Sequence, residues 1–316
     1  MPVLDHFAQL EQNVNLYARF TRTRNSPNTF LGFRGQTEMD DDAAKRADVD
    51  WQDSSPLAFT VFENDQQTLS MVREALRRGR VKLAYQPVVV AMNTARVGFY
   101  EGLIRILDSA GRPIPARAFM SAVEAHELGR EIDCASLNLG LQTLIQRPEL
   151  RLSINMSARS IGYPKWTRLL RQSLNDNPDL GDRLILEITE DSTMQLPEIV
   201  SALMRQFRGF GVSFALDDFG AGKISIPQLH SFGFDILKID GKFTRNILSS
   251  RSHQEIIAAL LAVAKQFERM SVAEAVETEE DARWLAALGL DMLQGHAFGA
   301  PTVTPPWEEQ AARKIG

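Results

Sequence analysis

The chain has 316 residues, 44% hydrophobic and 24% charged, which is near the average of folded globular proteins and excludes a disordered, collagen-like or disulfide-scaffold protein. A formal net charge of -5 provides no basic field for non-specific nucleic-acid binding, so we expect no DNA or RNA polymer as partner. The single Cys134 cannot form an internal disulfide, and the chain shows neither a secretory signal nor an apolar stretch of roughly 20 residues. These features predict a cytoplasmic protein without a membrane span.

The first sixty residues differ in texture from the rest. Leu4 to Phe20 has apolar residues at helical spacing, whereas Thr21 to Ser55 is polar, lacks a sustained period and contains the acidic run Glu38 to Asp42. The acidic run is more typical of a solvated loop than of a metal site, because no third ligand is spaced nearby. We expect a helix with a poorly ordered linker at residues 1–60, a folded domain at 65–305 and a tail at 306–316.

From about Asp65, short β-rich runs alternate with amphipathic helical stretches, which favours a mostly parallel sheet of β-α units. Eight strands are expected, starting near Val81, Ala95, Leu150, Leu184, Val212, Ile236, Met270 and Asp291. Helices are expected between them, for example at Pro197–Arg208 and Thr278–Leu288. Only Ala91–Thr94 separates the first two strands, too short for a parallel crossover, so they should form an antiparallel hairpin. The sequence therefore predicts an α/β fold, a (β/α)8-type barrel with one antiparallel early strand.

Polar side chains recur where the expected strands end. The set comprises Glu101, Asn155, Glu187, Asp217, Asp218, Lys238, Asp240, Glu274 and Gln294. The carboxyl ends of barrel strands open on one face, where the active sites of such barrels lie, so we expect these groups to gather there. Any single acid is more typical of a salt-bridged strand end than of a ligand. Because acids recur at successive strand ends, separate salt bridges at each strand are a poor explanation for the whole set.

Such a cluster of carboxylates would repel itself unless cations fill it, and oxygen ligands suit Mg²⁺ or Mn²⁺. Adjacent Asp217 and Asp218 would point to opposite faces of a regular strand, so both can serve only if the chain turns. The glycines of Phe219–Gly222 permit that turn. Two ions about 3.5 to 4 Å apart that share a carboxylate recur in phosphoester hydrolysis. The pattern therefore favours a phosphodiester substrate.

Ordered motifs between about Asp65 and Thr304 carry a family resemblance. They are AYQPVVV at Ala84, GFYEGLIR at Gly98, LSINMS at Leu152, LEITED at Leu186, LDDFGAG at Leu216, LKID at Leu237, VAEAVETEEDARWL at Val272 and LQGHAFGAP at Leu293. Together they resemble the EAL-domain family of cyclic di-GMP phosphodiesterases. The resemblance implies a TIM-like barrel and metal-dependent opening of cyclic di-GMP to linear pGpG.

The resemblance also implies a role for individual residues. Two ions, Mg²⁺ or Mn²⁺, would be held by Glu101, Asn155, Glu187, Asp217, Asp218 and Glu274. The implied catalytic set is Lys238, Glu274 and Glu101, with Lys238 holding the attacking water and Glu274 assisting its deprotonation. Contacts to the dinucleotide would come from Gln86, Arg105, Asp218 and Gln294. Glu190 would anchor the loop that follows Asp218.

Four departures from the family pattern distinguish this chain. Gly102 stands for Ala, Lys223-Ile224-Ser225 for an aromatic and two small hydroxyl residues, Gly241 for Arg, and Ala275 for Gly. The loop at Lys223 is linked in the family to metal binding and dimerisation. An alternative interpretation is therefore a weak or inactive domain that serves as a cyclic di-GMP receptor, and a metal-dependent enzyme acting on carbon acids is less favoured. A homodimer, and a protein partner bound through residues 1–60, are also expected.

Overall fold

The structure is a computed structural model, and it describes residues 56–305 and Trp307. The helix and linker expected within residues 1–55 lie outside the described residues, as does the expected tail apart from Trp307. The first described element is helix α2 (Pro56–Arg77). Trp307 packs edge-on against Tyr85 and Tyr100, with ring centroids 4.8 and 5.2 Å away. The division of the chain at residues 60, 65 and 305 stays a prediction.

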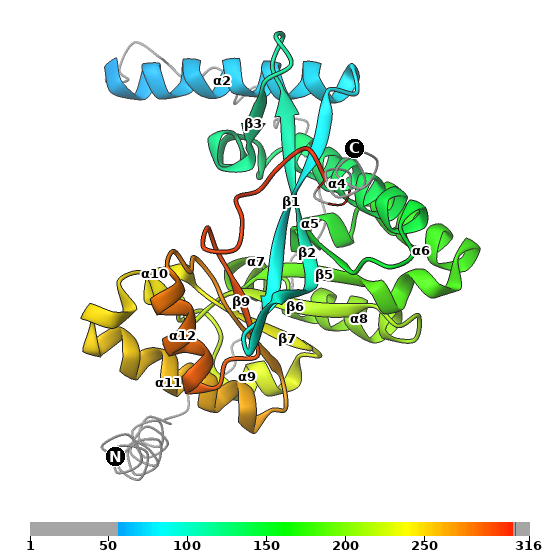
Figure 1. Cartoon of the computed structure of the whole chain (residues 1–316). Helices are drawn as coiled ribbons and strands as arrows, with labels where there is room; N and C mark the ends of the chain where they lie inside the picture. Colours follow the sequence, from blue (N-terminus) through cyan, green and yellow to red (C-terminus); the bar gives the residue numbers. More distant parts are fainter. Residues whose placement is uncertain (1–55, 306, 308–316) are drawn as a thin grey trace, which may run out of the picture. The chain divides into compact units, whose positions relative to one another are not determined.

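Eight strands close into the predicted barrel (Figure 1) in the order β1-β9-β8-β7-β6-β5-β4-β2, because β1 pairs with both β9 and β2. They are β1 (Val81–Val90), β2 (Asn93–Leu107), β4 (Leu152–Asn155), β5 (Leu184–Thr189), β6 (Ser213–Phe219), β7 (Ile236–Ile239), β8 (Met270–Ala273) and β9 (Met292–Gln294). One short strand outside the barrel, β3 (Pro113–Pro115), pairs with the end of β2. The sequence patterns missed β3 because it is three residues long and contains two prolines.

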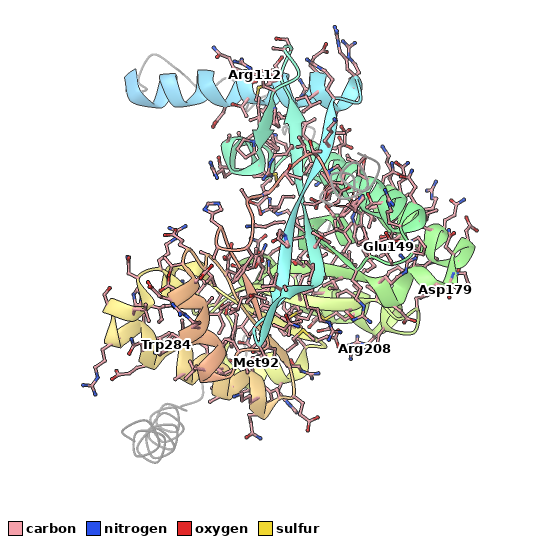
Figure 2. The ribbon with its side chains drawn as sticks, viewed as in Figure 1. Met92, Arg112, Glu149, Asp179, Arg208 and Trp284 are labelled. Carbon is pink, nitrogen blue, oxygen red and sulfur yellow. The ribbon has the colours of Figure 1, made fainter. Side chains whose placement is uncertain are left out.

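The predicted hairpin is present, and β1 is the antiparallel strand of the barrel. It pairs antiparallel with β2 from Val81 opposite Ile106 to Val90 opposite Asn93, and antiparallel with β9 on its other side. The remaining neighbours in the barrel pair in parallel. Met92 lies at the turn of the hairpin and is 81% exposed (Figure 2). The short connection enforces this arrangement, since it cannot return the chain to the start of the strand.

Helices fill the connections between the parallel strands. They are α3 (Met120–Val123), α4 (Glu127–Gln146), α5 (Ala158–Ile161), α6 (Pro164–Asp176), α7 (Glu190–Gln195), α8 (Pro197–Arg208), α9 (Ile226–Ser231), α10 (Gly241–Thr244), α11 (Arg251–Gln266) and α12 (Glu279–Leu288), with 3-10 turns at Ala116–Ala118, Pro178–Arg183 and Ile247–Ser249. The expected starts of α8 and α12 are confirmed: Pro197 opens α8, and the hydroxyl of Thr278 accepts from the Asp281 N–H at 3.1 Å. In the described part of the chain, no helix combines the length and apolarity needed to cross a membrane.

An apolar plug fills the barrel interior, and it decides which polar groups share that interior. It consists of Val88, Phe99, Ile185, Ala215, Ile236, Val272 and Met292. Side chains two positions apart on a strand face the same side. Gln86 lies two residues before Val88 on the antiparallel strand β1. Two residues after the other six plug residues lie, in the same order, Glu101, Glu187, Asp217, Lys238, Glu274 and Gln294. The alternation that buries the plug therefore turns these polar groups toward one axis.

Candidate active site

Lys238 is the hub of the site. Its side chain is completely buried, and Nζ lies 2.7 Å from Glu187 Oε2 and 2.8 Å from Glu274 Oε1. The same nitrogen lies 3.3 Å from Glu101 Oε2 and 3.3 Å from Asp217 Oδ1. An ammonium group is a compact donor of three hydrogen bonds, so one lysine can bring acids from four different strands to one point.

Amide side chains position Glu101 from both sides. Asn155 Nδ2 donates to Glu101 Oε1 at 2.6 Å, and Gln294 Nε2 donates to Glu101 Oε2 at 2.6 Å. Gln294 Nε2 also lies 3.1 Å from Gln86 Oε1, and Gln86 Nε2 donates to the carbonyl of Gly299 at 3.1 Å. A chain of hydrogen bonds therefore runs from β1 through β9 to β2 and β4.

The electrostatics of the site show an excess of negative charge. Burial raises the pKa of Glu187 to about 8, and the charge of Glu101 adds to the shift. Burial and Asp217 raise the pKa of Glu274 well above its ordinary value. Burial opposes the charge of Lys238 as well, but the surrounding carboxylates hold the pKa of its ammonium well above 10.5. One ammonium does not neutralise these acids, so a further cation would relieve the repulsion.

Glu101 shows the opposite shift. Burial favours its neutral form, but Lys238 and the hydrogen bonds from Gln294 and Asn155 together lower the pKa of Glu101 below its ordinary value. Glu101 therefore remains a carboxylate in the middle of the site, available as an anionic ligand.

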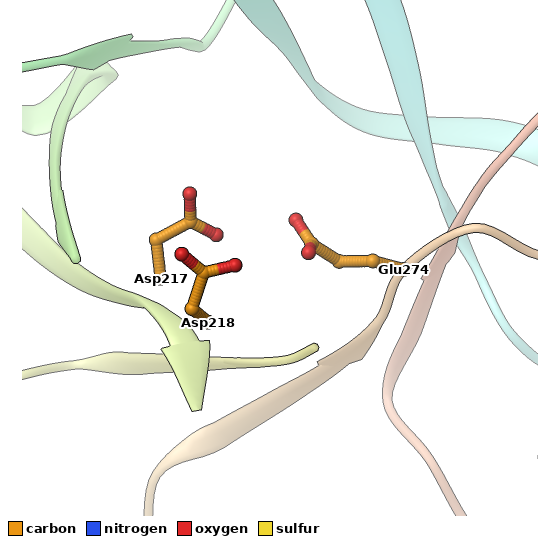
Figure 3. A group of neighbouring side chains, drawn as sticks. All are labelled: Asp217, Asp218 and Glu274. Carbon is orange, nitrogen blue, oxygen red and sulfur yellow. The ribbon is translucent and has the colours of Figure 1, made fainter. Parts of the chain in front are cut away.

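Asp217, Asp218 and Glu274 each offer an oxygen within 4.8 Å of the other two. Figure 3 shows the two aspartates projecting from the end of β6 toward Glu274. Asp218 reaches this position because its φ of 56° lies in the left-handed region, and the pairing of β6 with β7 shifts register between Leu216 and Phe219. The sequence placed the turn at Phe219–Gly222, whereas the structure begins it at Asp218 itself. Aspartate tolerates this backbone better than most residues.

The donor set fits a hard divalent cation. In the described part of the chain, Glu187 Oε1 and Gln294 Oε1 are buried oxygens that accept no hydrogen bond, and Asp217 Oδ1 has only its ion-pair contact with Lys238 Nζ at 3.3 Å. Buried carboxylate oxygens are costly without a partner. Oxygens of this kind, in a site with excess negative charge, are the ligands that Mg²⁺ and Mn²⁺ prefer. The cluster is therefore able to bind metal.

Glu190 contacts the backbone of the loop that follows β6. It is 1% exposed, and its two carboxylate oxygens accept from the N–H groups of Gly220 at 2.9 Å and Lys223 at 2.8 Å. On the surface, Lys223 Nζ lies 3.4 Å from Asp191 Oδ1. The loop after β6 is thus attached to α7 by its backbone and, more weakly, by the side chain of Lys223.

Arg105 is not part of the acidic cluster. It lies on β2 four residues beyond Glu101, and its guanidinium donates to the Ile104 carbonyl at 2.9 Å. Burial lowers its pKa, and the positive charge of Arg117 lowers it further. Among the described residues, Arg105 forms no ion pair, so its charge remains available for an anionic ligand.

Sequence reasoning missed three contributors to the site. Arg117 lies close enough to Arg105 to perturb its pKa, but Arg117 follows the unpredicted strand β3. The hydroxyl of Thr244 donates to the Glu274 carbonyl from α10, and no pattern in the sequence marks that long-range contact. Asp240 helps to raise the pKa of Asp218 to about 6, after burial and Asp217. Asp240 was visible as a strand-end acid, but it received no role.

Comparison with known proteins places these features in a family. The family model of the EAL domain matches residues 69–301. The chain is 29% identical over 270 residues to cyclic di-GMP phosphodiesterase PdeB of Shewanella oneidensis, covering 83% of this chain and 31% of that protein. It is 29% identical over 243 residues to cyclic di-GMP phosphodiesterase NbdA of Pseudomonas aeruginosa, covering 75% of this chain and 31% of that protein. The chain thus spans about a third of the length of these relatives.

Solved structures give the same result. PaMucR phosphodiesterase, solved as a c-di-GMP complex, is 26% identical with a TM-score of 0.67, and the match covers 77% of this chain and 99% of that one. The FimX EAL domain of Xanthomonas citri, also solved with c-diGMP, is 25% identical with a TM-score of 0.68, covering 78% of this chain and 98% of that one.

Proposed function

The chain belongs to the EAL-domain family, and from this premise we propose that it hydrolyses cyclic di-GMP to linear pGpG with two divalent metal ions. The observation that carries the proposal is the buried acid cluster around Lys238, whose unpartnered oxygens and excess negative charge suit metal ions. Related proteins named as cyclic di-GMP phosphodiesterases support the choice of substrate.

The proposed ligands lie within or directly after five strands, β2, β4, β5, β6 and β8. They are Glu101, Asn155, Glu187, Asp217, Asp218 and Glu274. Mg²⁺ or Mn²⁺ held there would acidify the attacking water and neutralise charge on the phosphate. The preference for hard cations follows from the all-oxygen donor set.

The side chains of this site would divide the remaining work. The Lys238 ammonium, which can only donate, would orient a water molecule, and the Glu274 carboxylate 2.8 Å from Nζ would accept its proton. The water oxygen attacks phosphorus, one P–O bond breaks, and the leaving oxygen takes up the proton that Glu274 accepted, so the products are a terminal phosphate and a free hydroxyl. The charges of Arg105 and Arg117 would attract the second phosphate.

The amides Gln86 and Gln294 would contact the dinucleotide where they border Glu101. Each amide offers both a donor and an acceptor, so the pair can read the polar edge of a base or hold a phosphate oxygen. Gln294 Oε1 has no donor among the described residues, which leaves it available to accept from a ligand.

The test is a hydrolysis assay on the purified full chain with Mg²⁺ or Mn²⁺, in which pGpG is separated from cyclic di-GMP by chromatography. The wild type should produce pGpG, and Glu101→Ala should lose at least about 100-fold in rate because a metal ligand is removed. Glu149→Ala, at a 58% exposed side chain (Figure 2), should leave the rate unchanged. Absence of pGpG with both metals would refute the proposal.

A receptor that binds cyclic di-GMP without hydrolysis is the second candidate. The observation that favours it is the loop after β6, where Lys223 contacts Asp191. Isothermal titration with cyclic di-GMP in the presence of Ca²⁺, paired with the hydrolysis assay, separates the two functions. Binding without turnover in Mg²⁺ or Mn²⁺ selects the receptor.

A homodimer, a cytoplasmic location and a protein partner bound through residues 1–60 complete the proposal. A cytoplasmic location is in keeping with the buried free thiol of Cys134. Sedimentation of the full chain and of a chain that lacks residues 1–55 would test self-association and the part those residues play in it.

A further inference from the structure

Ala275 directly follows Glu274 and holds an unusual backbone. Its φ is 51°, in the left-handed region that residues with a Cβ rarely adopt. Hydrogen bonds hold the neighbouring residues on both sides: the Glu274 N–H donates to Ile239 O at 3.3 Å, and the Val276 N–H donates to Gln294 O at 2.9 Å. The Thr244 hydroxyl also donates to the Glu274 carbonyl. A strained residue persists where its surroundings over-determine it, and here they do.

Gly241 packs against Ala275. It is the first residue of α10, and its φ is not among the positive values, so its own backbone would accept any amino acid. The space around Gly241, in contrast, would not accept a side chain. A Cβ added to Gly241 would lie 2.6 Å from the Cβ of Ala275, closer than two such atoms approach. Because each Cβ is attached directly to its backbone, neither can rotate away.

Relief of such a clash would disturb the site in either direction. Displacing Ala275 would displace Glu274, to which it is bonded. Displacing Gly241 would displace Asp240, whose N–H donates to the Phe219 carbonyl at 3.2 Å, next to Asp218.

We propose that Gly241 and Ala275 are a complementary steric pair that positions Glu274 for metal binding, and that a methyl group is tolerated at one of these two positions only. Both are positioning residues, since neither offers a side-chain donor or acceptor to metal or substrate. This inference rests on the proposed metal-dependent function. The glycine at 241 makes room for the alanine at 275.

The experiment compares Gly241→Ala, Ala275→Gly and the double variant with the wild type. Gly209→Ala is the matched control, because Gly209 has φ of -63° and nothing within 4 Å of an added Cβ. Mn²⁺ affinity is measured from the paramagnetic resonance signal of free Mn²⁺, thermal unfolding is measured without metal, and kcat and KM are measured with cyclic di-GMP.

Gly241→Ala should weaken Mn²⁺ binding at least about 10-fold and lower Tm by several degrees. Ala275→Gly and Gly209→Ala should each stay within about threefold of the wild-type affinity. The double variant should return to within about threefold of Ala275→Gly, because the second change removes the methyl that the first one meets. If Gly241 merely contributed to stability, Gly241→Ala would lower Tm without weakening Mn²⁺ binding, and there would be no loss of affinity for the double variant to restore.

Wild-type Mn²⁺ affinity in Gly241→Ala would overturn the inference, as would a double variant that binds Mn²⁺ as weakly as Gly241→Ala. If Gly241→Ala alone does not fold, a folded double variant that binds Mn²⁺ supports the pair, and one that does not bind overturns it. Failure of the proposed function would be recognised separately. Rescue of Mn²⁺ affinity together with absent hydrolysis would reject the phosphodiesterase and keep the steric pair.

Discussion

Replacement of Lys238 by Met tests the central idea of the site, that the acids are held together by cations. Methionine matches the length and volume of the buried lysine stem but removes the ammonium. Four carboxyl oxygens that lie 2.7 to 3.3 Å from Nζ would then lose their shared donor and counter-charge. Removal of one partner from a buried ionic group costs about 3 to 5 kcal/mol, since the remaining charges stay desolvated.

Metal should offset part of this loss. Mn²⁺ that binds only the folded state stabilises it by about 2.7 kcal/mol at 100 times its dissociation constant. The acids of Lys238→Met have lost their internal cation, so this variant should gain more stability from Mn²⁺ than the wild type does. The cost of the substitution should therefore be smaller with saturating Mn²⁺ than in chelator.

Urea unfolding with chelator and with Mn²⁺, followed by circular dichroism, measures both effects. Lys165→Met is the control, because Lys165 is an exposed residue of α6 and its substitution should change the free energy of unfolding by about 0.5 kcal/mol or less. The reasoning is wrong if Lys238→Met unfolds in chelator within about 1 kcal/mol of the wild type. It is also wrong if Mn²⁺ stabilises both proteins equally.

Three further predictions concern Glu190 and two buried groups of α4. Glu190→Gln keeps only one acceptor for the N–H groups of Gly220 and Lys223, so the loop should open more often. Trypsin should then cleave after Lys223 about 10-fold faster, as followed by mass spectrometry. An unchanged cleavage rate would argue that Glu190 does not anchor the loop. Burial raises the pKa of Asp133 to about 6, so the stability that this group contributes is full below its ordinary pKa of 3.8 and is lost as pH rises toward 6. Between pH 3.8 and 6, the free energy of unfolding measured in urea should fall by about 3 kcal/mol more for the wild type than for Asp133→Asn. If the free energies of the two proteins change with pH in parallel, the raised pKa of Asp133 is wrong. Burial also raises the pKa of the Cys134 thiol to about 11, so a disulfide reagent at pH 8 should react with it only after denaturation.

The period of two along the strands made much of this site predictable. Glu101, Glu187 and Glu274 each lie two residues beyond an apolar residue of the barrel plug, and that spacing can be read without coordinates. Backbone irregularity could not be read in the same way. The left-handed turn at Asp218 depends on a register shift against β7, and the packing of Ala275 on Gly241 joins residues that are far apart in the chain. Such features follow from tertiary contacts, not from local pattern.

The end of β7 couples both irregular segments of the site. Among the described residues, four non-glycine residues have positive φ; of these, Asp218 belongs to the acidic cluster and Ala275 directly follows Glu274 of that cluster. Ile239 pairs with Phe219 after Asp218, and its carbonyl accepts from the Glu274 N–H before Ala275. The strand that carries Lys238 therefore supports the strained turns on both of its sides. Because one short strand bears the central ammonium and holds the turns at Asp218 and Ala275, a shift of β7 would alter the charge balance and the geometry of the acidic cluster together.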